Sequence, residues 1–268
     1  MSAAELYGWL RADPIGWVMV ALVGAAFGSF INVVIYRLPR GLSLVSPPSR
    51  CVSCERRIRP HENIPILSYV LLRGRCRGCG SRIPLRYPAV ELAAAALTCG
   101  AVALTGYWLE AVVWILFTLS LLAVIFIDLD FQIIPDRISL PGAALGVLWA
   151  LLGPPPVRDA LLGVLAGGGG LFLIAVAYQR IAGREGMGMG DVKLMAMVGA
   201  FLGWQGALGT LLVGSLTGSL VGGLLIARGK GSRQTALPFG TFLAPAAYLV
   251  LFAGEALWRA YLSLLFSS

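Results

Sequence analysis

The stretch AVVWILFTLSLLAVIFIDLD at residues 111–130 decides the fold, because a membrane-length apolar run ends there in two acids. A membrane-spanning helix needs roughly 20 mostly apolar residues. A carboxylate in or beside the bilayer core is costly and is usually functional. Asp128 is the deeper acid and directly follows three apolar residues. Asp130 points about 200° away on a helix, so both cannot serve one site unless the helix ends between them.

A second acid stands at the start of another apolar run. Asp191 lies in GMGMGDVKLM, residues 186–195, after glycines that alternate with methionines. Glycine allows backbone where no side chain fits, so an extended peptide could lie close to this segment. Asp191 also suits the N-cap of the helix that follows it, and the local sequence leaves that capping role open as an alternative.

Composition excludes a soluble domain. Of 268 residues, 58% are hydrophobic and only 13% are charged, and the mean hydropathy is +0.82. We therefore expect an all-α polytopic membrane protein. The segment at 192–203 is short, and is either re-entrant or merged with its neighbour. About eight transmembrane helices are predicted, at 17–36, 89–105, 109–127, 138–153, 158–178, 192–203, 206–227 and 243–264.

The placement of basic residues predicts the orientation. Residues 37–88 hold eleven arginines, namely Arg37, Arg40, Arg50, Arg56, Arg57, Arg59, Arg73, Arg75, Arg77, Arg82 and Arg86. The positive-inside rule puts this loop in the cytosol and the N-terminus outside. Alternation then puts the loops near 128–137, 179–191 and 228–242 inside, so Asp128 and Asp191 share the inner face. Topogenic charge explains most of the basic loop, and contact with anionic lipid or substrate is the alternative.

Three parts follow along the chain. Residues 1–36 are the N-terminus and first transmembrane helix, 37–88 a small cytosolic loop domain, and 89–268 a helical bundle. The loop domain carries two Cys-x-x-Cys pairs that predict one structural zinc ion, bound by Cys51, Cys54, Cys76 and Cys79. Disulfides are the alternative, but the reducing cytosol opposes them. Cys99 is expected to be a packing residue, and His61 a surface residue rather than a ligand.

Two carboxylates at one membrane face suit acid–base chemistry. In an aspartyl mechanism of peptide hydrolysis, one carboxylate activates water while the other, protonated, donates to the scissile carbonyl. Neighbouring carboxylates share a proton, because both cannot ionise cheaply at short range. We consider two rivals. A proton-coupled transporter also carries intramembrane acids, but more often at the midplane of inverted repeats. A zinc-bearing membrane scaffold would explain the cysteines alone.

Together these motifs resemble the bacterial type IV prepilin peptidases, which are GxGD-type intramembrane aspartyl proteases with N-methyltransferase activity. The resemblance spans nearly the whole chain. It includes GSFINVVIYRLP at 28–39, CVSC at 51–54, ENIPILSYVLLRGRCRGCG at 62–80, RYPAVELAAA at 86–95, IDLDFQIIPD at 127–136, GMGMGDVKLM at 186–195 and LPFGTFLAP at 237–245. It implies Asp128 and Asp191 as the catalytic pair, with Asp130 second. Family members often have proline where this chain has Thr241.

The resemblance also implies an activity, a donor and a location. Leaders of type IV prepilins or type II secretion pseudopilins would be cut after glycine at the cytosolic face of the bacterial inner membrane. The new N-terminal residue would then be methylated from S-adenosylmethionine, and the cysteine-bearing loop accompanies the methylating members. No glycine-rich Rossmann motif for the donor is present. The candidate donor-binding residues are Glu62, Gly74, Arg75 and Glu91. Membrane lipid is an expected partner, and nucleic acid is not.

Overall fold

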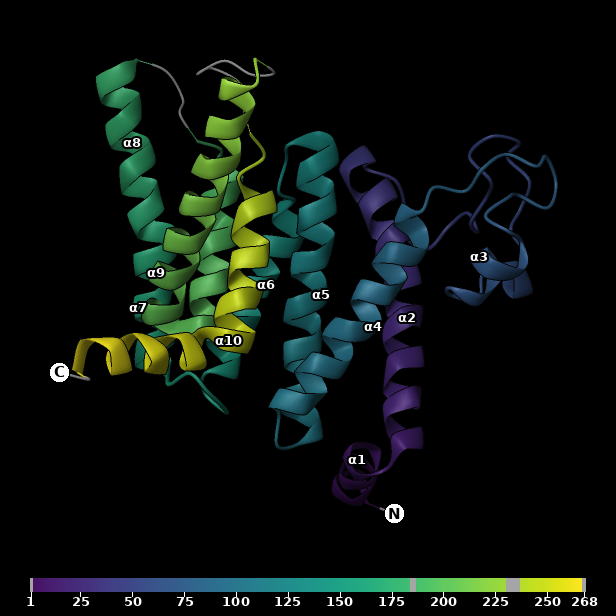
Figure 1. The fold of residues 1–268 in the computed structure, drawn as a ribbon, viewed down its shortest axis with the longest axis horizontal. Helices are drawn as coiled ribbons and strands as arrows, with labels where there is room; N and C mark the ends of the chain where they lie inside the picture. Colours follow the sequence, from purple (N-terminus) through teal and green to yellow (C-terminus); the bar gives the residue numbers. More distant parts are fainter. Residues whose placement is uncertain (1, 184–186, 230–236, 267–268) are drawn as a thin grey trace. The chain divides into compact units, whose positions relative to one another are not determined.

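Helices make up nearly all the regular structure of the chain (Figure 1). The computed structural model describes residues 2–183, 187–229 and 237–266, although several side chains beyond residue 256 are not described. Residues 184–186 and 230–236, which belong to the loops near 179–191 and 228–242 and include the first glycine of the motif at 186–195, lie outside these residues. The chain divides into two units, Met1–Ala123 and Val124–Ser268.

The first unit pairs two membrane-length helices through small residues. Helix α2 (Pro14–Arg37) begins at Asp13, whose side chain accepts from the Ile15 N–H, and packs on α4 (Arg86–Leu104). A Cβ placed on Gly28 would lie 2.6 Å from the Cα of Glu91. Such close backbone approach is typical of membrane helices that associate without a large hydrophobic driving force. The packing places Glu91 directly against α2.

Short elements complete the first unit. Helix α1 (Ala3–Ala12) starts with a capping box, and its buried Tyr7 hydroxyl lies 2.6 Å from the Thr105 hydroxyl just after α4. The loop between α2 and α4 holds only η1 (Leu38–Arg40), η2 (Pro60–Glu62) and α3 (Leu67–Leu71) as described helices. The first unit also contains most of α5 (Trp108–Phe131).

The second unit is a bundle that begins with the last turns of α5. Before the final helix, four helices follow among the described residues, with a π-helical turn between the second and third: α6 (Asp136–Trp149), α7 (Val157–Val164), η3 (Leu165–Gly169), α8 (Gly170–Ala182) and α9 (Met189–Ala227). The GGGG run at 167–170 lies where the chain packs closely on α9. A Cβ on Gly168 would lie 2.8 Å from the Ala196 Cβ, and η3 forms the π-helical turn.

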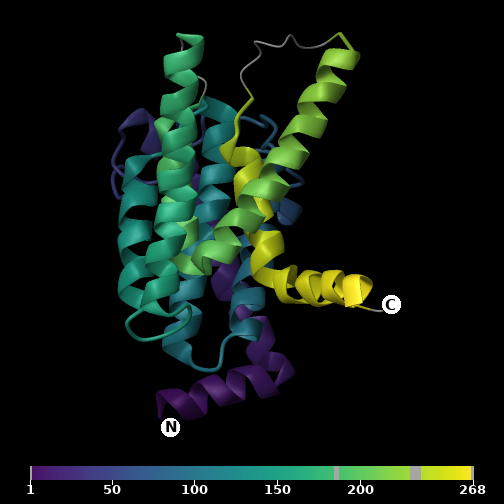
Figure 2. The ribbon, with the colours of Figure 1, turned by 90° about the vertical axis from the view of Figure 1, so that its left-hand side faces the viewer.

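Helix α9 reverses direction within its length. Gly203 has a non-helical backbone (φ 68°, ψ −178°), which glycine adopts without a Cβ penalty. The two limbs of α9 meet at this residue, and both ends of the helix lie on the same side of the unit (Figures 1 and 2). The expected pair at 192–203 and 206–227 is therefore one helical element broken at Gly203.

The final helix, α10 (Gly240–Phe266), packs on α9, and its last part runs across the direction of its first (Figure 2). The all-α membrane fold is confirmed. Five described helices are long and apolar enough to cross a bilayer: Pro14–Arg40, Arg86–Leu104, Trp108–Phe131, Val157–Ala182 and Met189–Ala227. Gly240–Ala256 is a shorter apolar helix. The count of eight spans stays a prediction.

Candidate active site and metal centre

Asp128 lies in the last turn of α5 and is almost fully buried, with 4% of its surface exposed. Its Oδ2 accepts a hydrogen bond from the Thr241 N–H at 2.9 Å and another from the Thr241 hydroxyl at 3.2 Å. Thr241 is the second residue of α10. A buried carboxylate needs such donors, because desolvation is otherwise uncompensated. The C-terminal end of α5 and the start of α10 therefore meet at one carboxylate.

Asp191 is also buried, with 8% of its surface exposed. It is the third residue of α9, and the N-cap is Gly188, which makes no side-chain cap. The N-cap alternative for Asp191 is therefore wrong. The carboxylate lies in the first helical turn, where the helix dipole favours negative charge. Asp191 also interacts electrostatically with Asp128.

Ile134 packs between the segments that carry the two acids. A Cβ on Gly190 would lie 2.9 Å from the Ile134 Cβ, and one on Gly240 would lie 2.8 Å from the Ile134 Cδ1. The same Cβ on Gly240 would be 3.0 Å from Asp128 Oδ2. Glycine at both positions lets the start of α9 and the start of α10 close around the end of α5. The result is a pair of buried carboxylates in the second unit.

The neighbouring acids occupy different surroundings. Asp130 is exposed, two residues beyond Asp128. Asp136, at the start of α6, is exposed and pairs with Lys193 Nζ at 2.7 Å. Lys193 is only two residues after Asp191 in the sequence, but its partner in the structure is Asp136. This ion pair joins α6 to α9 beside the buried pair.

Each Cys-x-x-Cys pair in the first unit forms a knuckle. In the first, the Cys51 N–H donates to the Arg56 carbonyl at 2.9 Å; in the second, the Cys76 N–H donates to the Ser81 carbonyl at 2.8 Å. The β-bridges Arg50–Arg57 and Arg75–Arg82 close the two turns. The two knuckles are thus built in the same way, 25 residues apart in the sequence.

The four thiols fit a tetrahedral metal ion. Their sulfur atoms all lie within 4.8 Å of one another, and the Sγ atoms of Cys51 and Cys79 are 4.0 Å apart. Four sulfurs at about 2.3 Å from one zinc ion would be roughly 3.8 Å apart. All five cysteines are free, so the disulfide alternative is not realised. His61 is exposed and is not a member of the cluster.

The acidities of the thiols also indicate a cation. The backbone N–H of Ser53 lowers the pKa of Cys51 to about 6. The backbone N–H of Arg56 acts in the same direction on Cys54, but hydrogen bonds with the neighbouring thiols outweigh it and raise the pKa of Cys54 to about 11. Hydrogen bonds from the Ser81 hydroxyl and the Ser81 backbone N–H lower the pKa of Cys79 as well, so the shifts differ in direction within the cluster and Cys54 is the thiol that resists ionisation. A dication is what allows such ligands to be deprotonated together.

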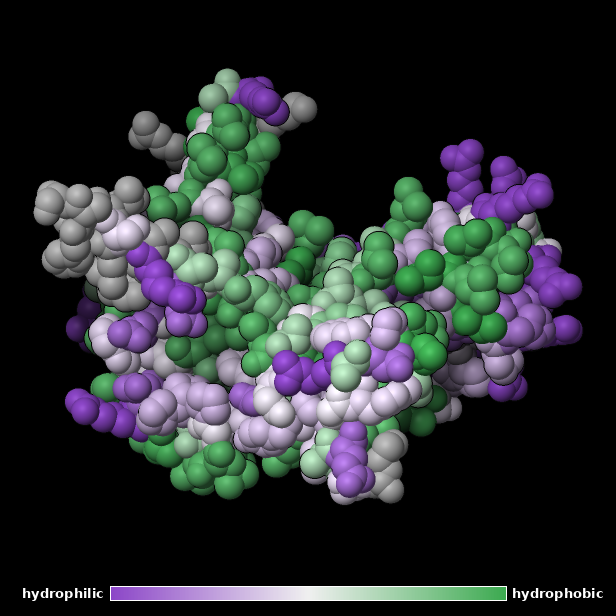
Figure 3. Space-filling view, turned by 60° about the horizontal axis from the view of Figure 1, so that its bottom comes forward, coloured by the Kyte–Doolittle hydropathy of each residue, from purple (hydrophilic) through white to green (hydrophobic). Residues whose placement is uncertain are grey.

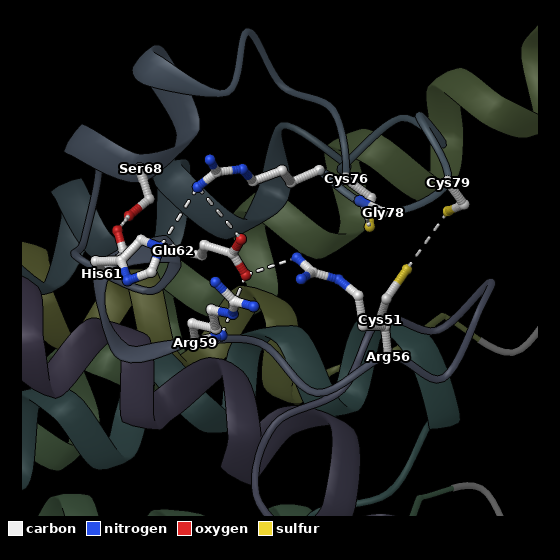
Figure 4. Close-up of polar contacts among 10 residues, drawn as sticks. Cys51, Arg56, Arg59, His61, Glu62, Ser68, Cys76, Gly78 and Cys79 are labelled. Carbon is white, nitrogen blue, oxygen red and sulfur yellow. Dashed lines mark hydrogen bonds and ion pairs between the residues drawn. The ribbon is translucent and has the colours of Figure 1, made fainter.

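Glu62 links the knuckles to the rest of the loop domain (Figure 4). Its Oε2 accepts from Arg56 Nη2 at 2.7 Å and from the Arg59 N–H at 3.1 Å. These two donors, Arg56 first, lower the pKa of Glu62 to about 2. The side chain is only 4% exposed, and Oε1 has Arg77 Nη1 at 3.9 Å but accepts no hydrogen bond from the described residues. One oxygen of a buried, ionised carboxylate is therefore available to a ligand.

A cavity of about 550 Å³ lies beside this oxygen. It falls in the range of about 300–1,000 Å³ typical of small-molecule sites. Glu62 and Glu91 line it, together with Tyr69 and Tyr87. Glu91 Oε2 accepts from the Ile66 N–H at 2.7 Å, and the Ser29 side chain also hydrogen-bonds to the Glu91 carboxylate. Gly74 and Arg75 are not among the lining residues; Gly74 is buried at a turn (φ 64°) under the Tyr69 ring.

The sequence did not reveal the roles of two residues that contact the segments carrying the buried pair. Thr241 is 113 residues from Asp128, and only a motif match singled out its segment. Ile134 looked like one more apolar residue before Pro135. No local pattern identifies either one, because their roles come from long-range packing. The only local hint of the role of Thr241 is its position after Gly240 at the start of an apolar helix.

A helical membrane protein with a buried aspartate pair and a four-cysteine cluster that could hold a metal ion has the features of a membrane-embedded peptidase. The family comparisons agree. Residues 22–105 match the Bacterial Peptidase A24 N-terminal domain, and residues 115–223 match the Type IV leader peptidase family. The chain belongs to this leader peptidase family.

Relatives match over nearly the full length. The chain is 39% identical to a prepilin leader peptidase/N-methyltransferase of Pseudomonas putida, covering 97% of this chain and 99% of the relative. It is 37% identical to the protein of the same description from Pseudomonas aeruginosa, covering 96% and 97%, and 35% identical to that of Neisseria gonorrhoeae, covering 92% and 94%. No solved structure matches. The chain is thus a membrane-embedded peptidase and N-methyltransferase, not a transporter or a scaffold.

Proposed function

We propose that this chain cuts the leader from type IV prepilins or type II secretion pseudopilins with Asp128 and Asp191, then methylates the new N-terminus. The burial of both aspartates in one unit carries the peptidase proposal. Asp128 accepts two hydrogen bonds at Oδ2, which favours its ionised form. Asp128 is then the base that takes a proton from water. Asp191 is protonated and donates its proton to the oxygen of the scissile carbonyl group.

The test is cleavage of a purified prepilin by purified variants, with the product measured by mass. Asp128→Asn and Asp191→Asn should each abolish cleavage while the protein still inserts. Asp136→Asn is the matched control, because Asp136 is an exposed acid paired to Lys193, and it should retain cleavage. Substantial cleavage by Asp128→Asn, combined with loss in Asp130→Asn, would move the base to Asp130.

The domain at 37–88 is proposed to carry methyl transfer. Cys51, Cys54, Cys76 and Cys79 would hold one zinc ion that folds the knuckles, since a loop this short buries little core of its own. S-adenosylmethionine, which supplies an activated methyl group when bound, would occupy the cavity beside Glu62. The ionised, unbonded Oε1 suits the amine or ribose hydroxyls of the donor, and the two tyrosines suit its base and its cationic sulfur.

The roles of the donor-site candidates separate by position. Glu62 contacts the donor, whereas Glu91 is a positioning residue, because its Oε2 is already bonded to the Ile66 N–H. Gly74 and Arg75 remain predicted contributors that act from outside the cavity lining. Calorimetric titration with S-adenosylmethionine tests this assignment. Glu62→Gln should weaken binding at least 10-fold, and Glu110→Gln, a half-buried acid of the same unit that does not line the cavity, should not. Unchanged binding by Glu62→Gln would remove Glu62 from the site.

We further propose the bacterial inner membrane as the location, with the N-terminus periplasmic and the zinc domain and both aspartates at the cytosolic face. The arginines of residues 37–88 support this orientation. To test it, one cysteine at a time is introduced at Ser2 or at Ser53 in a Cys99→Ala background with zinc bound. The labelling of each introduced cysteine by a membrane-impermeant reagent is then measured. Labelling at residue 2 alone from the periplasm agrees with the proposal, and labelling at residue 53 alone contradicts it.

A further inference from the structure

The short helix α3 presents an unusually apolar surface for a basic loop domain. Its residues Leu67, Val70 and Leu71 are 50%, 64% and 70% exposed, and Ile64 just before it is 45% exposed. We call these four residues the apolar tip. Figure 3 shows a hydrophobic patch on the side of the molecule that holds α3, bordered by strongly hydrophilic residues. A contiguous exposed apolar patch marks an interaction surface.

The apolar tip lies beside the membrane helices rather than beyond their ends. The Ile66 N–H is bonded to Glu91 Oε2 at 2.7 Å, and Glu91 is five residues after the start of α4, roughly 7.5 Å along its axis. The cavity under the loop domain reaches Ser29 on α2, eight residues before Arg37 and so roughly 12 Å from the helix end. Figure 1 shows α3 beside α2, below the end of α2 that leads into the loop.

The backbone at Ile66 holds the tip at this depth. Ile66 has φ 61° and ψ −51°, and the Leu67 N–H donates to the Pro65 carbonyl at 2.5 Å. This is the rare, strained form of the γ-turn, and it is especially unfavourable for a β-branched residue. Such a conformation persists only when surrounding contacts impose it. The bond from the Ile66 N–H to Glu91 is one such contact, so α3 is fastened to α4.

Charge selects the partner of the tip. The loop domain at 37–88 carries eleven arginines against only two acids, Glu55 and Glu62. Arg57, Arg73 and Arg75 are exposed. An apolar face at a depth of about 5–10 Å below a basic surface is the pattern of a helix that lies in the interface of an anionic bilayer. A protein partner would not require the depth set by the bond to Glu91.

We propose that the apolar tip inserts into the anionic leaflet next to α2 and α4, and that the arginines around it contact lipid headgroups. The consequence for catalysis rests on the proposed methyl-transfer function. Insertion of the apolar tip places the donor cavity at the surface of the bilayer. A substrate held in the membrane by its own apolar segment presents its new N-terminal amine at that level. The loop domain is then a membrane-docked catalytic domain whose substrate arrives by lateral diffusion.

Depth-dependent quenching tests the insertion directly. A fluorescent amino acid is placed at Leu71 of the full-length protein, in vesicles of phosphatidylcholine and phosphatidylglycerol that contain lipid nitroxides near the headgroup. Strong quenching is expected at Leu71, with at least a twofold loss in vesicles of phosphatidylcholine alone. Ser53, exposed at the tip of the first knuckle, is the matched control and should show little quenching. Equal quenching at both positions, or none at Leu71, overturns the proposal. Quenching at Leu71 that requires added prepilin overturns it in favour of substrate as the occupant.

A functional arm separates this inference from the proposed function. The triple variant Leu67→Ser, Val70→Ser, Leu71→Ser should lose methylation of membrane-held substrate at least 10-fold in vesicles. Its affinity for S-adenosylmethionine, its cleavage of prepilin and its methylation of a soluble pre-cut peptide should stay within about twofold of wild type. Wild-type protein that methylates neither substrate would count against the proposed function. A triple variant that methylates both substrates normally would count against membrane docking only.

Discussion

Thr241 donates two hydrogen bonds to a single oxygen of Asp128, from its N–H at 2.9 Å and from its hydroxyl at 3.2 Å. The backbone bond holds the carboxylate against the start of α10, and the hydroxyl bond depends on the side chain. Both the backbone and the side chain of Thr241 therefore hold the same carboxylate oxygen. Proline could supply neither donor, since it lacks both the N–H and the hydroxyl.

The hydroxyl should matter for turnover rather than for substrate binding. Thr241→Val keeps the shape and the N–H but removes one donor to an ionised carboxylate, a bond that contributes about 1.5–3 kcal/mol. We expect kcat of leader cleavage to fall roughly 10- to 100-fold with KM nearly unchanged. Thr241→Ser should restore the rate, because it restores the donor. A merely structural role would be indicated if Val and Ser variants lost activity equally, or if the acidic limb of the pH–rate profile did not move in the Val variant.

Gly240 should tolerate no side chain next to the same carboxylate. A Cβ there would be 2.8 Å from Ile134 Cδ1 and 3.0 Å from Asp128 Oδ2. Ile134 can shift its flexible end, but Asp128 is fixed by Thr241. We expect Gly240→Ala to lower kcat about 10-fold through displacement of the carboxylate. Gly169→Ala is the control, since a Cβ there meets nothing within 4 Å. Equal activity of the two variants would contradict this account of Gly240.

The predicted zinc site can be tested by the metal content of the purified protein. Purified protein should contain about one zinc per chain, because four thiolates complete one tetrahedral site. Cys54→Ser should lose the metal, and Cys99→Ser, a substitution in α4 outside the cluster, should keep it. Elemental analysis of both proteins decides the matter. Two disulfides in protein isolated without air would overturn the site.

Acid should weaken the loop domain through Glu62. Its pKa is lowered from 4.5 to about 2, chiefly by the Arg56 hydrogen bond, so the folded state holds the ionised form more tightly than the unfolded state does. The contribution to stability is fully present above about pH 4.5 and is lost as the pH falls through about 2. The thermal unfolding temperature of the wild type should exceed that of Glu62→Gln at pH 6, and this difference should shrink toward pH 2. A difference independent of pH would exclude the ion pair as its cause. Loss of metal in acid affects both proteins and cancels in the comparison.

The elements that local patterns specify could be predicted from the sequence. Apolar length predicted the helices, and the paired spacing predicted the cluster of Cys51, Cys54, Cys76 and Cys79, whose sulfurs do converge. The acid at the end of one helix and the acid at the start of another were identified because carboxylates are rare in apolar surroundings. Their burial within one unit agrees with the inner-face argument, although orientation across the membrane stays a prediction.

Contacts that depend on three-dimensional closure could not be predicted. The Thr241 bond to Asp128 spans 113 residues, and the Lys193 bond to Asp136 spans 57. The reversal of α9 rests on the backbone of the single residue Gly203, which resembles many other glycines of the chain. The depth of α3 follows from a strained turn at Ile66 that no propensity favours. Such features arise where tertiary packing overrides local preference.

The two activities should be separable. The aspartate pair belongs to the second unit, and the cysteine cluster and the donor cavity belong to the first. Metal would largely hold the loop domain, whereas packing in lipid holds the helices. Disrupting the cysteine site should therefore impair methylation first and leave measurable cleavage. Because the amine exists only after cleavage, Asp191→Asn should lose both modifications on full-length prepilin but still methylate a pre-cut peptide. Separability fails if Asp191→Asn binds S-adenosylmethionine normally yet cannot methylate that peptide. It also fails if Cys54→Ser inserts correctly and loses cleavage as completely as methylation.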